Sequence, residues 1–363
     1  MPSTLALGFA TKCPPWHLVS PLFPDKIGGR PAWLALKQLP QPCDLACPTC
    51  SNPMAFVLQL YSPVDGREDC FHRVLFLFMC LNGGCHCKDK KPPFAVFRSQ
   101  LPRCNAYYSF EPPENEEPSL DEVMSLITER KLPCAELFTS VCPVCGCKAD
   151  KLCSKCRVVH YCSKSHQVLH WKEHKKTCAP GLNELSGPSF TENKYLLPEY
   201  RLISRTVDDS HDESGSSDSE EEPIPCEGVE EGDGEDAVLE SLAKHESKEE
   251  ARFRKFKELM NPDPDQVVRF GGEPFWLSEH QPPIEACEVC GAERKFEFQV
   301  TPQLLSYFAL DRVGHASPDF GSLYIFTCSK SCALPRTEFR DGGGSEPCVV
   351  EYQRELVIRQ MVP

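Results

Sequence analysis

Eight cysteine and histidine side chains in the middle of the chain form four closely spaced pairs, C-x2-C-x7-C-x2-C-x5-C-x3-H-x7-H-x3-C. Cysteine thiolate and neutral histidine are ligands that zinc prefers, and a structural zinc site takes four of them. Eight ligands therefore predict two closed sites that stabilise a fold rather than catalyse a reaction. Two neighbours, Cys147 and His170, are interpreted as spare because both sites are already complete. The predicted ligands are Cys142, Cys145, Cys153, Cys156, Cys162, His166, His174 and Cys178.

The redox setting decides whether such cysteines bind metal or form disulfides. The first residues lack the basic segment and apolar core of a secretory signal. The longest apolar run, from Val74 to Leu81, is far shorter than the roughly 20 residues that span a bilayer. We therefore expect an intracellular chain without a membrane segment. In that setting its 23 cysteines stay reduced and CxxC pairs bind metal.

A helix must position the last ligands of this set. Residues 163–178 contain no glycine or proline and predict a short helix. Cys162 and His166 form one i, i+4 pair, and His174 and Cys178 form another, about 18 Å further along the axis. One ion cannot reach both pairs. The spacing leaves open which CxxC motif completes which pair.

The two ends of the chain carry a repeated pattern. KIGGRPAWLA at 26–35 and RFGGEPFWLS at 269–278 share Gly, Gly, Pro, Trp and Leu at fixed spacing. A CxxC motif follows each, and Gln59 and Gln299 lie at equal distances from these motifs. A second cysteine pair then follows in both copies. Three matches in the same order indicate two copies of one module.

Each module is predicted to be mainly β, with one zinc site of its own. Alternating apolar and polar residues predict strands over 56–64, 73–81, 94–99, 295–303, 323–329 and 349–359. Four thiolates per module are the ligand set of a zinc ribbon. In the first module Cys85 and Cys87 compete for one place, and the repeat favours Cys85. Trp33 and Trp276 are interpreted as core anchors. The predicted ligands are Cys47, Cys50, Cys80 and Cys85 in the first module and Cys287, Cys290, Cys328 and Cys332 in the second.

The predicted fold class is mainly β with α: two zinc-ribbon-like β modules form one unit, with an inserted zinc finger and an acidic linker. The modules cover 1–112 and 245–363, the finger 134–180 and the linker 181–244. From Asp208 to Glu240 the linker has fifteen Asp or Glu and no Lys or Arg, and removing it changes the net charge from −14 to +1. Such a segment is predicted to be disordered. The inserted finger is expected to fold as its own unit, because few contacts cross linkers.

Residues 242–260, which follow the acidic run, predict an amphipathic helix. Phe253, Phe256 and Met260 would lie on one side of it and pack on the second module. Asn261 and Pro262 are expected to end this helix.

The stretch from Cys142 to Cys178 resembles a MYND-type zinc finger, in which the first and third ligand pairs share one metal. The resemblance implies one zinc ion held by Cys142, Cys145, Cys162 and His166, and another held by Cys153, Cys156, His174 and Cys178. The family usually has cysteine where this chain has His166, and zinc accepts either ligand.

Nearly the whole chain resembles the programmed cell death protein 2 family. The resemblance rests on GGRPAWL, the finger sequence CGCKADKLCSKCRVVHYCSKSHQ, AKHESKEEARFRKFK and CGAERKFEFQVTPQLLSYF. It implies a non-enzymatic protein of the cytoplasm and nucleus that acts as a chaperone for a small-subunit ribosomal protein and supports ribosome biogenesis. Family roles in cell proliferation and apoptosis could follow from ribosome supply. A basic client would suit the acidic linker, and an exposed sheet edge could bind a client segment as an extra strand.

Two other functions remain open at this point. A transcriptional adaptor would bind corepressor peptides through the finger, near an exposed Trp171. A nucleic-acid binder would use the basic finger, which has eight Lys or Arg against two acids. Nucleic acid is disfavoured as a partner, because the acidic linker would compete with phosphate. An enzyme is not expected either. MYND fingers occur in lysine methyltransferases, but no cofactor-binding signature of a methyltransferase lies outside the finger. The glycine-rich run DGGGS at 341–345 does not lie between a strand and a helix, so it does not predict a phosphate site.

Overall fold

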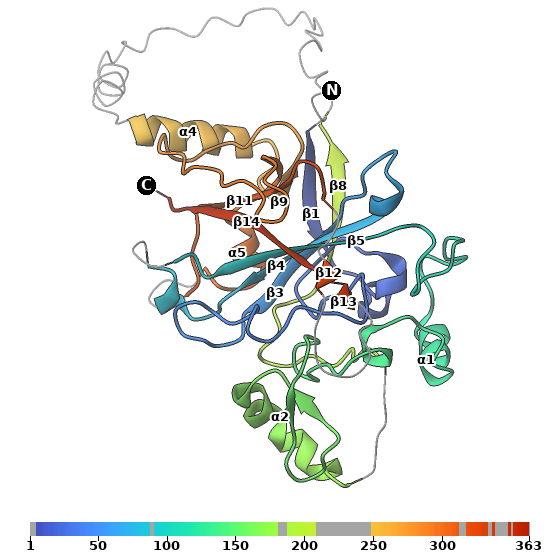
Figure 1. Ribbon diagram of the computed structural model, residues 1–363. Helices are drawn as coiled ribbons and strands as arrows, with labels where there is room; N and C mark the ends of the chain where they lie inside the picture. The colour runs from blue at the N-terminus through green and yellow to red at the C-terminus, as the bar shows by residue number, and fades with distance from the viewer. Residues whose placement is uncertain are drawn as a thin grey trace, which may run out of the picture.

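Ten strands close into one antiparallel barrel in the computed structural model (Figure 1). The structure describes residues 5–87, 91–180, 187–207, 248–311, 317–332, 336–337, 348–349 and 351–362. In order around the barrel, the strands are β1 (Ala6–Thr11), β8 (Tyr200–Thr206), β2 (Lys26–Ile27), β3 (Ala55–Tyr61), β4 (His72–Met79), β5 (Phe94–Leu101), β14 (Gln353–Gln360), β11 (Ser322–Cys328), β10 (Arg294–Val300) and β9 (Gln266–Phe270).

Helices and short strands surround this barrel. The α-helices of the described residues are α1 (Leu120–Thr128), α2 (Lys164–Thr177), α4 (Lys248–Met260) and α5 (Gln303–Tyr307). Short 3₁₀ turns are η1 (Pro15–His17), η2 (Ser20–Leu22), η3 (Glu68–Cys70), η4 (Gly83–Cys85) and η5 (Ala135–Leu137). Two small pairs join β6 (Lys151–Leu152) to β7 (His160–Tyr161) and β12 (Arg336–Thr337) to β13 (Cys348–Val349). Among the described residues, none of the helices has the length and apolar composition needed to cross a bilayer.

The repeated pattern becomes the two halves of the barrel. The first half runs β2-β3-β4-β5 and the second runs β9-β10-β11-β14, and the halves meet where β5 pairs with β14. Each half has a β-bulge at the equivalent place: between Phe56 and Leu58 in β3, and between Phe296 and Phe298 in β10. A bulge shifts the register of every later pair in its strand. The two copies therefore share fine geometry as well as sequence.

The aligned glutamines hold the same loop in both halves. The Gln59 side chain accepts from the backbone N–H of Ala32 at 2.9 Å and donates to its carbonyl at 3.2 Å. Gln299 makes the same two hydrogen bonds with Phe275, at 3.0 and 3.2 Å. Ala32 and Phe275 each precede the tryptophan of the repeat. The buried amides thus fix the tryptophan loops on the sheet.

Both tryptophans pack on aromatic side chains of the strand behind them. Trp33 is buried, and its ring centroid lies 5.1 Å from that of Phe76. Trp276 lies 4.3 Å from Tyr324, the equivalent residue of the second half, and is half-buried. The interpretation of these residues as anchors is confirmed for Trp33, which is 2% exposed.

The barrel interior is a single apolar cluster. Leu75 and Leu77 of β4 belong to the same buried cluster as Leu323 and Ile325 of β11, so this face is shared by both halves. Alternate residues of the same strands face outward, as the period of two requires. Leu304 of α5 also joins the interior cluster, so this short helix packs against the barrel core.

Residues 187–207 differ from the prediction of a disordered linker over 181–244. Tyr200–Thr206 forms β8, which pairs with β1 on one side and with β2 on the other. Of this strand only Leu202 is buried, so the local pattern gives little signal, and its partner β1 lies nearly 200 residues away in sequence. The rest of the linker lies outside the described residues. The zinc-ribbon-like character of the halves stays a prediction.

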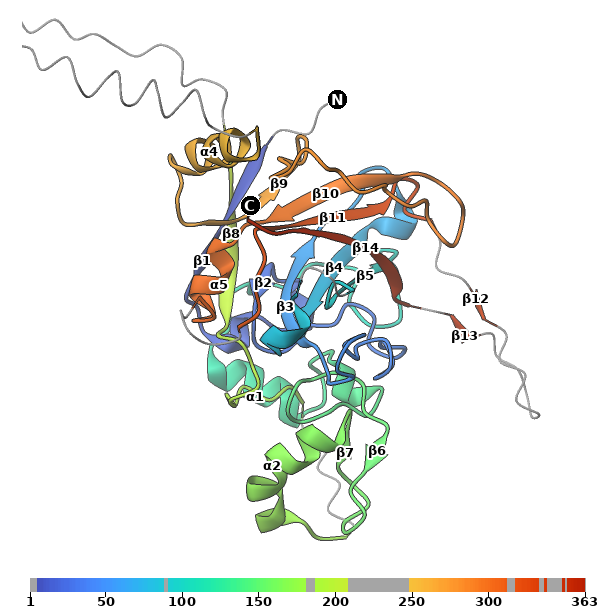
Figure 2. The same ribbon diagram turned by 90° about the vertical axis from the view of Figure 1, so that its left-hand side faces the viewer.

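The amphipathic helix predicted over 242–260 is present as α4 (Lys248–Met260), and residues 242–247 lie outside the described residues. Phe256 and Met260 are buried against Leu277, which follows the second tryptophan. The helix therefore packs on the tryptophan loop of the second half, as its apolar side predicted. Figure 1 and Figure 2 show it at the end of the barrel opposite the finger, which is drawn in green.

Candidate metal centres

All four CxxC motifs adopt the same tight turn. In each, the carbonyl of the first cysteine accepts a hydrogen bond from the backbone N–H four residues later, and that donor residue has a positive φ. The donors are Ser51 to Cys47 at 2.9 Å, Gly146 to Cys142 at 2.8 Å, Arg157 to Cys153 at 2.9 Å and Gly291 to Cys287 at 2.8 Å. Positive φ favours glycine, so Ser51 and Arg157 adopt it under constraint from the turn. One local geometry thus prepares all four pairs of sulfurs.

The finger brings its eight predicted ligands into two clusters. Within each cluster all ligand atoms lie within 4.8 Å of one another. The first contains Cys142, Cys145, Cys162 and His166; the second contains Cys153, Cys156, His174 and Cys178. This is the interleaved grouping that the MYND resemblance implies. Cys147 and His170 lie outside both clusters, as the ligand count predicted: the Cys147 thiol contacts the Cys145 carbonyl, and His170 pairs with the Tyr161 hydroxyl.

The spacings within these clusters fit a zinc ion. The Cys145 and Cys162 sulfurs are 3.7 Å apart, and the Cys156 sulfur is 3.5 Å from Nε2 of His174. Tetrahedral zinc with sulfur at about 2.3 Å separates its sulfur ligands by about 3.8 Å. A disulfide would need about 2.05 Å. The donors and their spacing therefore suit a closed zinc site.

Helix α2 distributes ligands between the two finger clusters. Its N-cap is Ser163, whose hydroxyl accepts a hydrogen bond from the His166 backbone N–H at 3.1 Å. The cap begins the helix directly after Cys162, so Cys162 and His166 meet at its first turn. His174 lies two turns further on and reaches the second cluster.

Each half of the barrel holds one cluster of four cysteines, among the residues that the structure describes. The first is Cys47, Cys50, Cys80 and Cys85, and the second is Cys287, Cys290, Cys328 and Cys332. The sulfurs of Cys50 and Cys80 are 3.6 Å apart, and those of Cys290 and Cys328 are 3.5 Å apart. Cys87 is exposed and lies outside the first cluster, so the structure places Cys85 there and not its competitor.

The thiols of the barrel clusters have unequal acidities. Burial, followed by the Cys50 and Cys47 thiols, raises the pKa of Cys85 to about 11. Burial also opposes ionisation of Cys328, but the backbone N–H of Cys332 and the Cys290 thiol outweigh it and lower the pKa of Cys328 to about 7. Neighbouring thiolates repel one another, so a cluster cannot ionise fully without a cation. A divalent ion would remove that repulsion.

Two arginines reach from one half of the barrel to the cysteine-containing loops of the other half. Arg98 on β5, in the first half, donates to the Cys332 carbonyl at 3.2 Å and to the Cys332 sulfur at 3.8 Å. Arg359 on β14, the equivalent strand of the second half, donates to the carbonyls of His86 at 2.8 Å and Cys87 at 3.2 Å. In each half, the loop that carries the second cysteine pair therefore accepts hydrogen bonds from an arginine of the other half.

Buried ion pairs also join the two halves near the junction of β5 with β14, which we call the seam. Arg98 pairs with Glu355 at 2.7 Å, and both side chains are fully buried. Arg73 pairs with Glu297 at 2.7 Å, again between halves. Glu355 also accepts a hydrogen bond from the Cys328 backbone N–H at 3.2 Å. The seam and the second cluster thus share one polar network.

Sequence reasoning missed these charged residues. The sequence offered one signal for them, a charged residue within an apolar strand. Arg98 in the segment FAVFRS is an example. A buried charge requires a partner. The partner itself, Glu355, lies more than 250 residues away and could not be identified without the barrel topology.

The finger docks on the first half through its first CxxC turn. Three backbone carbonyls of that turn accept hydrogen bonds from side chains outside the finger. The donors are Arg30 to Pro143 at 3.0 Å, Asn193 to Val144 at 2.9 Å and Trp33 to Gly146 at 2.8 Å. Cys142 and Cys145 also belong to the same buried cluster as Trp33. The expectation that few contacts link the finger to the rest is therefore wrong for its first zinc site.

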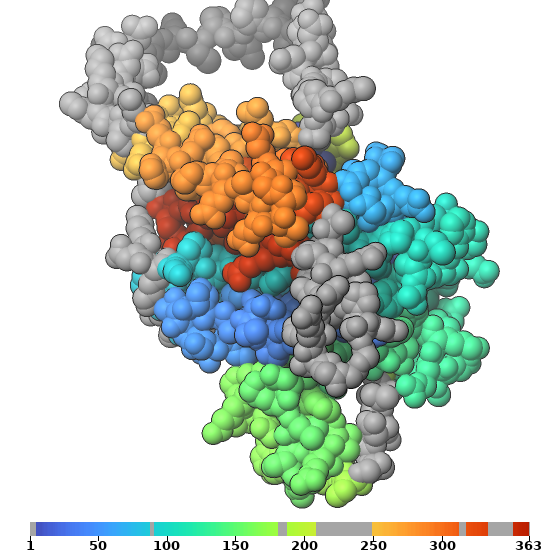
Figure 3. All heavy atoms as spheres, viewed as in Figure 1, coloured from blue at the N-terminus to red at the C-terminus, as the bar shows by residue number. Residues whose placement is uncertain are grey.

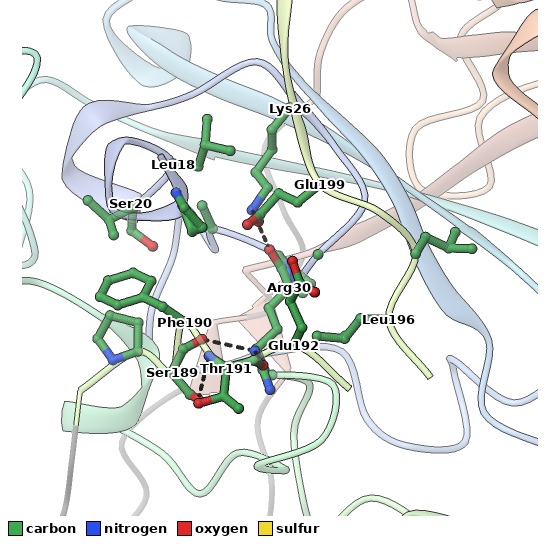
Figure 4. A pocket seen from close by; sticks show the side chains of 18 of the residues that line it. Leu18, Ser20, Lys26, Arg30, Ser189, Phe190, Thr191, Glu192, Leu196 and Glu199 are labelled. Carbon is green, nitrogen blue, oxygen red and sulfur yellow. Dashed lines mark hydrogen bonds and ion pairs between the residues drawn. The ribbon is translucent and has the colours of Figure 1, made fainter. Parts of the chain in front are cut away.

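Arg30 is the centre of this docking (Figure 4). Besides Pro143, its guanidinium donates to the carbonyls of Ser189 and Thr191, both at 2.9 Å. Beside it, Lys26 forms an ion pair with Glu199. These residues line a cavity of about 480 Å³ between the barrel, the finger and residues 188–200. One side chain thus ties three segments together.

Replacing Arg30 with methionine is expected to undock the finger while leaving the four cysteine clusters intact. Hydrogen bonds from a charged donor contribute about 1.5–3 kcal/mol each. Of the three that are lost, one joins the finger directly at Pro143, and the other two hold Ser189 and Thr191 beside it. Amide exchange in residues 142–147 should accelerate at least about tenfold, while β3 and β4 remain protected. Lys37→Met, at an exposed position, is the control. Unchanged exchange in 142–147 would show that Arg30 does not hold the finger.

The purified chain is expected to carry about four zinc ions, one for each cluster. Native mass spectrometry measures this number directly. A count of two would contradict both barrel sites and leave those of the finger. A count of three would contradict one barrel site, and the Cys47→Ser and Cys287→Ser variants would show which, because only one of them would lose an ion.

Comparison with known proteins covers nearly the whole chain. Residues 4–115 match the N-terminal domain of programmed cell death protein 2, residues 250–360 match its C-terminal domain, and residues 142–178 match the MYND finger. Programmed cell death protein 2 of Bos taurus is 45% identical over 335 residues, which cover 90% of this chain and 92% of the relative. The Rattus norvegicus protein is 43% identical, covering 92% and 94%. No solved structure matches the chain.

A more distant relative also matches over most of the chain. Programmed cell death protein 2-like of Homo sapiens is 27% identical over 336 residues, which cover 86% of each chain. The matched domains coincide with the two halves of the barrel and with the finger. The chain therefore belongs to the programmed cell death protein 2 family.

Proposed function

We propose that this protein is a non-enzymatic, zinc-stabilised chaperone that captures a basic small-subunit ribosomal protein and so supports ribosome biogenesis. The observation that carries the proposal is the complete ligand set of each cluster in the described part of the chain. Four protein donors leave no open position on a zinc ion for substrate or water. The metal ions then stabilise the fold, and the outer surfaces bind the client.

The charge of the chain favours a basic client. The net charge is −14, and fifteen acidic residues lie between Asp208 and Glu240 without a single Lys or Arg. A basic protein that normally binds RNA needs an anionic partner to stay soluble away from RNA, and such a partner also accelerates encounter. The family resemblance supplies the choice of a ribosomal protein, and with it a location in both cytoplasm and nucleus. Effects on cell death would then follow from ribosome supply.

Closure of the barrel removes the sheet edges to which a client strand could be added. Addition of a strand requires a free sheet edge, but the ten-stranded sheet closes on itself. The expectation of strand addition to this sheet is therefore wrong. Side chains on the outer surface are left to bind the client.

Affinity capture of the tagged full-length protein from cells, followed by mass spectrometry, tests this function. The proposal expects one small-subunit ribosomal protein in stoichiometric amount. Capture without any ribosomal protein would overturn it. The Cys287→Ser and Cys290→Ser double variant controls for capture by unfolded chain.

One observation favours a second function, a transcriptional adaptor that binds corepressor peptides. Trp171 on α2 is 41% exposed and Val168, one turn away, is 67% exposed. Exposed apolar side chains on one helix face suit a short proline-containing peptide. In the same capture experiment, a corepressor in place of a ribosomal protein would support this function, and Trp171→Ala should then release it.

A further inference from the structure

A groove lined by aromatic side chains lies on the outer surface of the first half. Its volume is about 1060 Å³. A second hollow of about 570 Å³ is continuous with it, because Tyr61, Phe71, Arg103 and Phe110 line both. Figure 3 shows the two segments that flank it, which follow β3 and β5, side by side at the right of the molecule. Together the two hollows form one continuous groove.

The floor of the groove is rigid and its walls are exposed. The Phe23 ring stacks on His72 with centroids 4.3 Å apart and meets Tyr108 edge-on at 4.8 Å. The wall residues Phe71 and Phe110 are 40% and 55% exposed. Exposed aromatic rings above a fixed floor are typical of a recognition surface.

The groove is acidic. Seven acids and four bases line the two hollows, which gives a net charge of −3. The acids are Asp25, Asp65, Glu68, Glu111, Glu114, Glu116 and Glu117, and the bases are Arg67, Arg103, Lys131 and Arg201. Among the ion pairs of the described residues, Glu117 is the one acid of these seven with a partner, Arg201. The remaining carboxylates are available to a cationic ligand.

One guanidinium already occupies the junction of the two hollows. The Arg103 guanidinium lies 4.0 Å from the Phe110 ring centroid and 5.2 Å from that of Phe71. Its Nε also donates to the Phe110 carbonyl at 3.2 Å. Arginine stacks on aromatic faces more readily than lysine does. Both rings thus already hold one guanidinium of this chain, and their exposed parts remain for a ligand.

Asp25 adds a negative charge at the floor. This half-buried carboxylate accepts a hydrogen bond from the Tyr61 backbone N–H at 2.5 Å. Burial raises the pKa of Asp25 to about 6, against the lowering effect of that hydrogen bond. A cation that entered the groove would stabilise the ionised form.

We propose that this groove binds an extended, arginine-containing segment of the client, with guanidinium groups against Phe71 and Phe110 and along the glutamates that follow them. The proposal rests on the proposed function, since it names where the basic client is held. Nucleic acid is excluded as an occupant, because phosphates would meet a surface of the same charge.

The test uses the full chain and a fluorescent nona-arginine peptide that carries a photo-crosslinker. Three neutralised glutamates (Glu111→Gln, Glu114→Gln, Glu116→Gln) should weaken binding about tenfold at 150 mM salt, since each exposed ion pair that is lost weakens binding about twofold. A matched triple variant of exposed glutamates on the second half (Glu273→Gln, Glu279→Gln, Glu285→Gln) should change it less than about twofold. Crosslinks are expected on residues 61–72 and 103–117.

A second variant tests the stacking itself. Phe110→Ala should weaken nona-arginine binding and leave nona-lysine binding nearly unchanged, because lysine gains less from the ring. Crosslinks confined to 208–240, or equal weakening by both triple variants, would overturn the groove. Affinity capture from cells separates the two proposals. If the wild type and the groove variant capture a ribosomal protein equally well, the groove proposal alone is overturned. No ribosomal protein on the wild type would overturn the proposed function.

Discussion

Serine in place of Cys287 and Cys290 is expected to abolish the native barrel, not merely to loosen one surface turn. In small zinc domains the ion contributes roughly 10–16 kcal/mol, while whole domains are stable by roughly 5–15 kcal/mol. The cluster is also tied to the other half, because Arg98 donates to Cys332 and Glu355 accepts from Cys328. Loss of the ion therefore removes support from both sides of the seam.

Circular dichroism with thermal melting and zinc content measures this effect. The double variant should show no cooperative transition above 25 °C and should lose at least one zinc ion. Cys43→Ser and Cys104→Ser, both exposed and outside every cluster of the described residues, are the matched controls and should melt as the wild type does. A double variant with the wild-type melting temperature would show that this cluster contributes no folding energy.

The second large effect is expected at Arg98. Arg98→Met leaves Glu355 with one buried partner, Arg294, in place of two. Breaking a buried ion pair costs about 3–5 kcal/mol, and the remaining pair keeps the expected loss near 3 kcal/mol. Because Arg98 also donates to the Cys332 sulfur, zinc in the second cluster should be more easily removed by a chelator.

Urea unfolding and the rate of zinc release report these two consequences separately. Arg205→Met removes an arginine from an exposed ion pair with Asp263 and should cost less than about 1 kcal/mol. If Arg98→Met were no more destabilising than this control, the ion pair at the seam would not hold the halves together. An unchanged rate of zinc release would show that Arg98 does not help to retain zinc in the second cluster.

How far the sequence predicts this molecule depends on the range of each signal. Short-range patterns are reliable: helix α2 begins at its serine cap, and each CxxC motif forms a turn in which the residue after the second cysteine adopts a positive φ. The internal repeat is a longer pattern, and the matching hydrogen bonds of Gln59 and Gln299 show that it reports shared structure. In these cases the interacting residues can be recognised without knowing the fold.

Long-range pairings gave no such signal. β8 is mostly exposed and pairs with the N-terminal strand β1, so its composition resembles that of a linker. The reciprocal placement of Arg98 and Arg359 depends on β5 and β14 being neighbours, which only the closed barrel establishes. The docking of the finger could not be predicted from the sequence either. Its hydrogen-bond acceptors are backbone carbonyls, which every residue carries, so they leave no pattern of residue types.

If the protein binds a basic client as proposed, we expect the barrel, and not the finger, to hold it. Cys153→Ser with Cys156→Ser removes the outer zinc site of the finger, while the first site stays docked on Trp33 and Arg30. Client co-purification is measured beside hydrogen exchange for this variant and for the triple glutamine variant of the groove. We expect the finger variant to keep its ribosomal client while exchange rises only within 148–178, and the groove variant to lose the client with all strands protected. Loss of the client from the finger variant, with β3, β4, β10 and β11 still protected, would contradict the account and place binding on the finger.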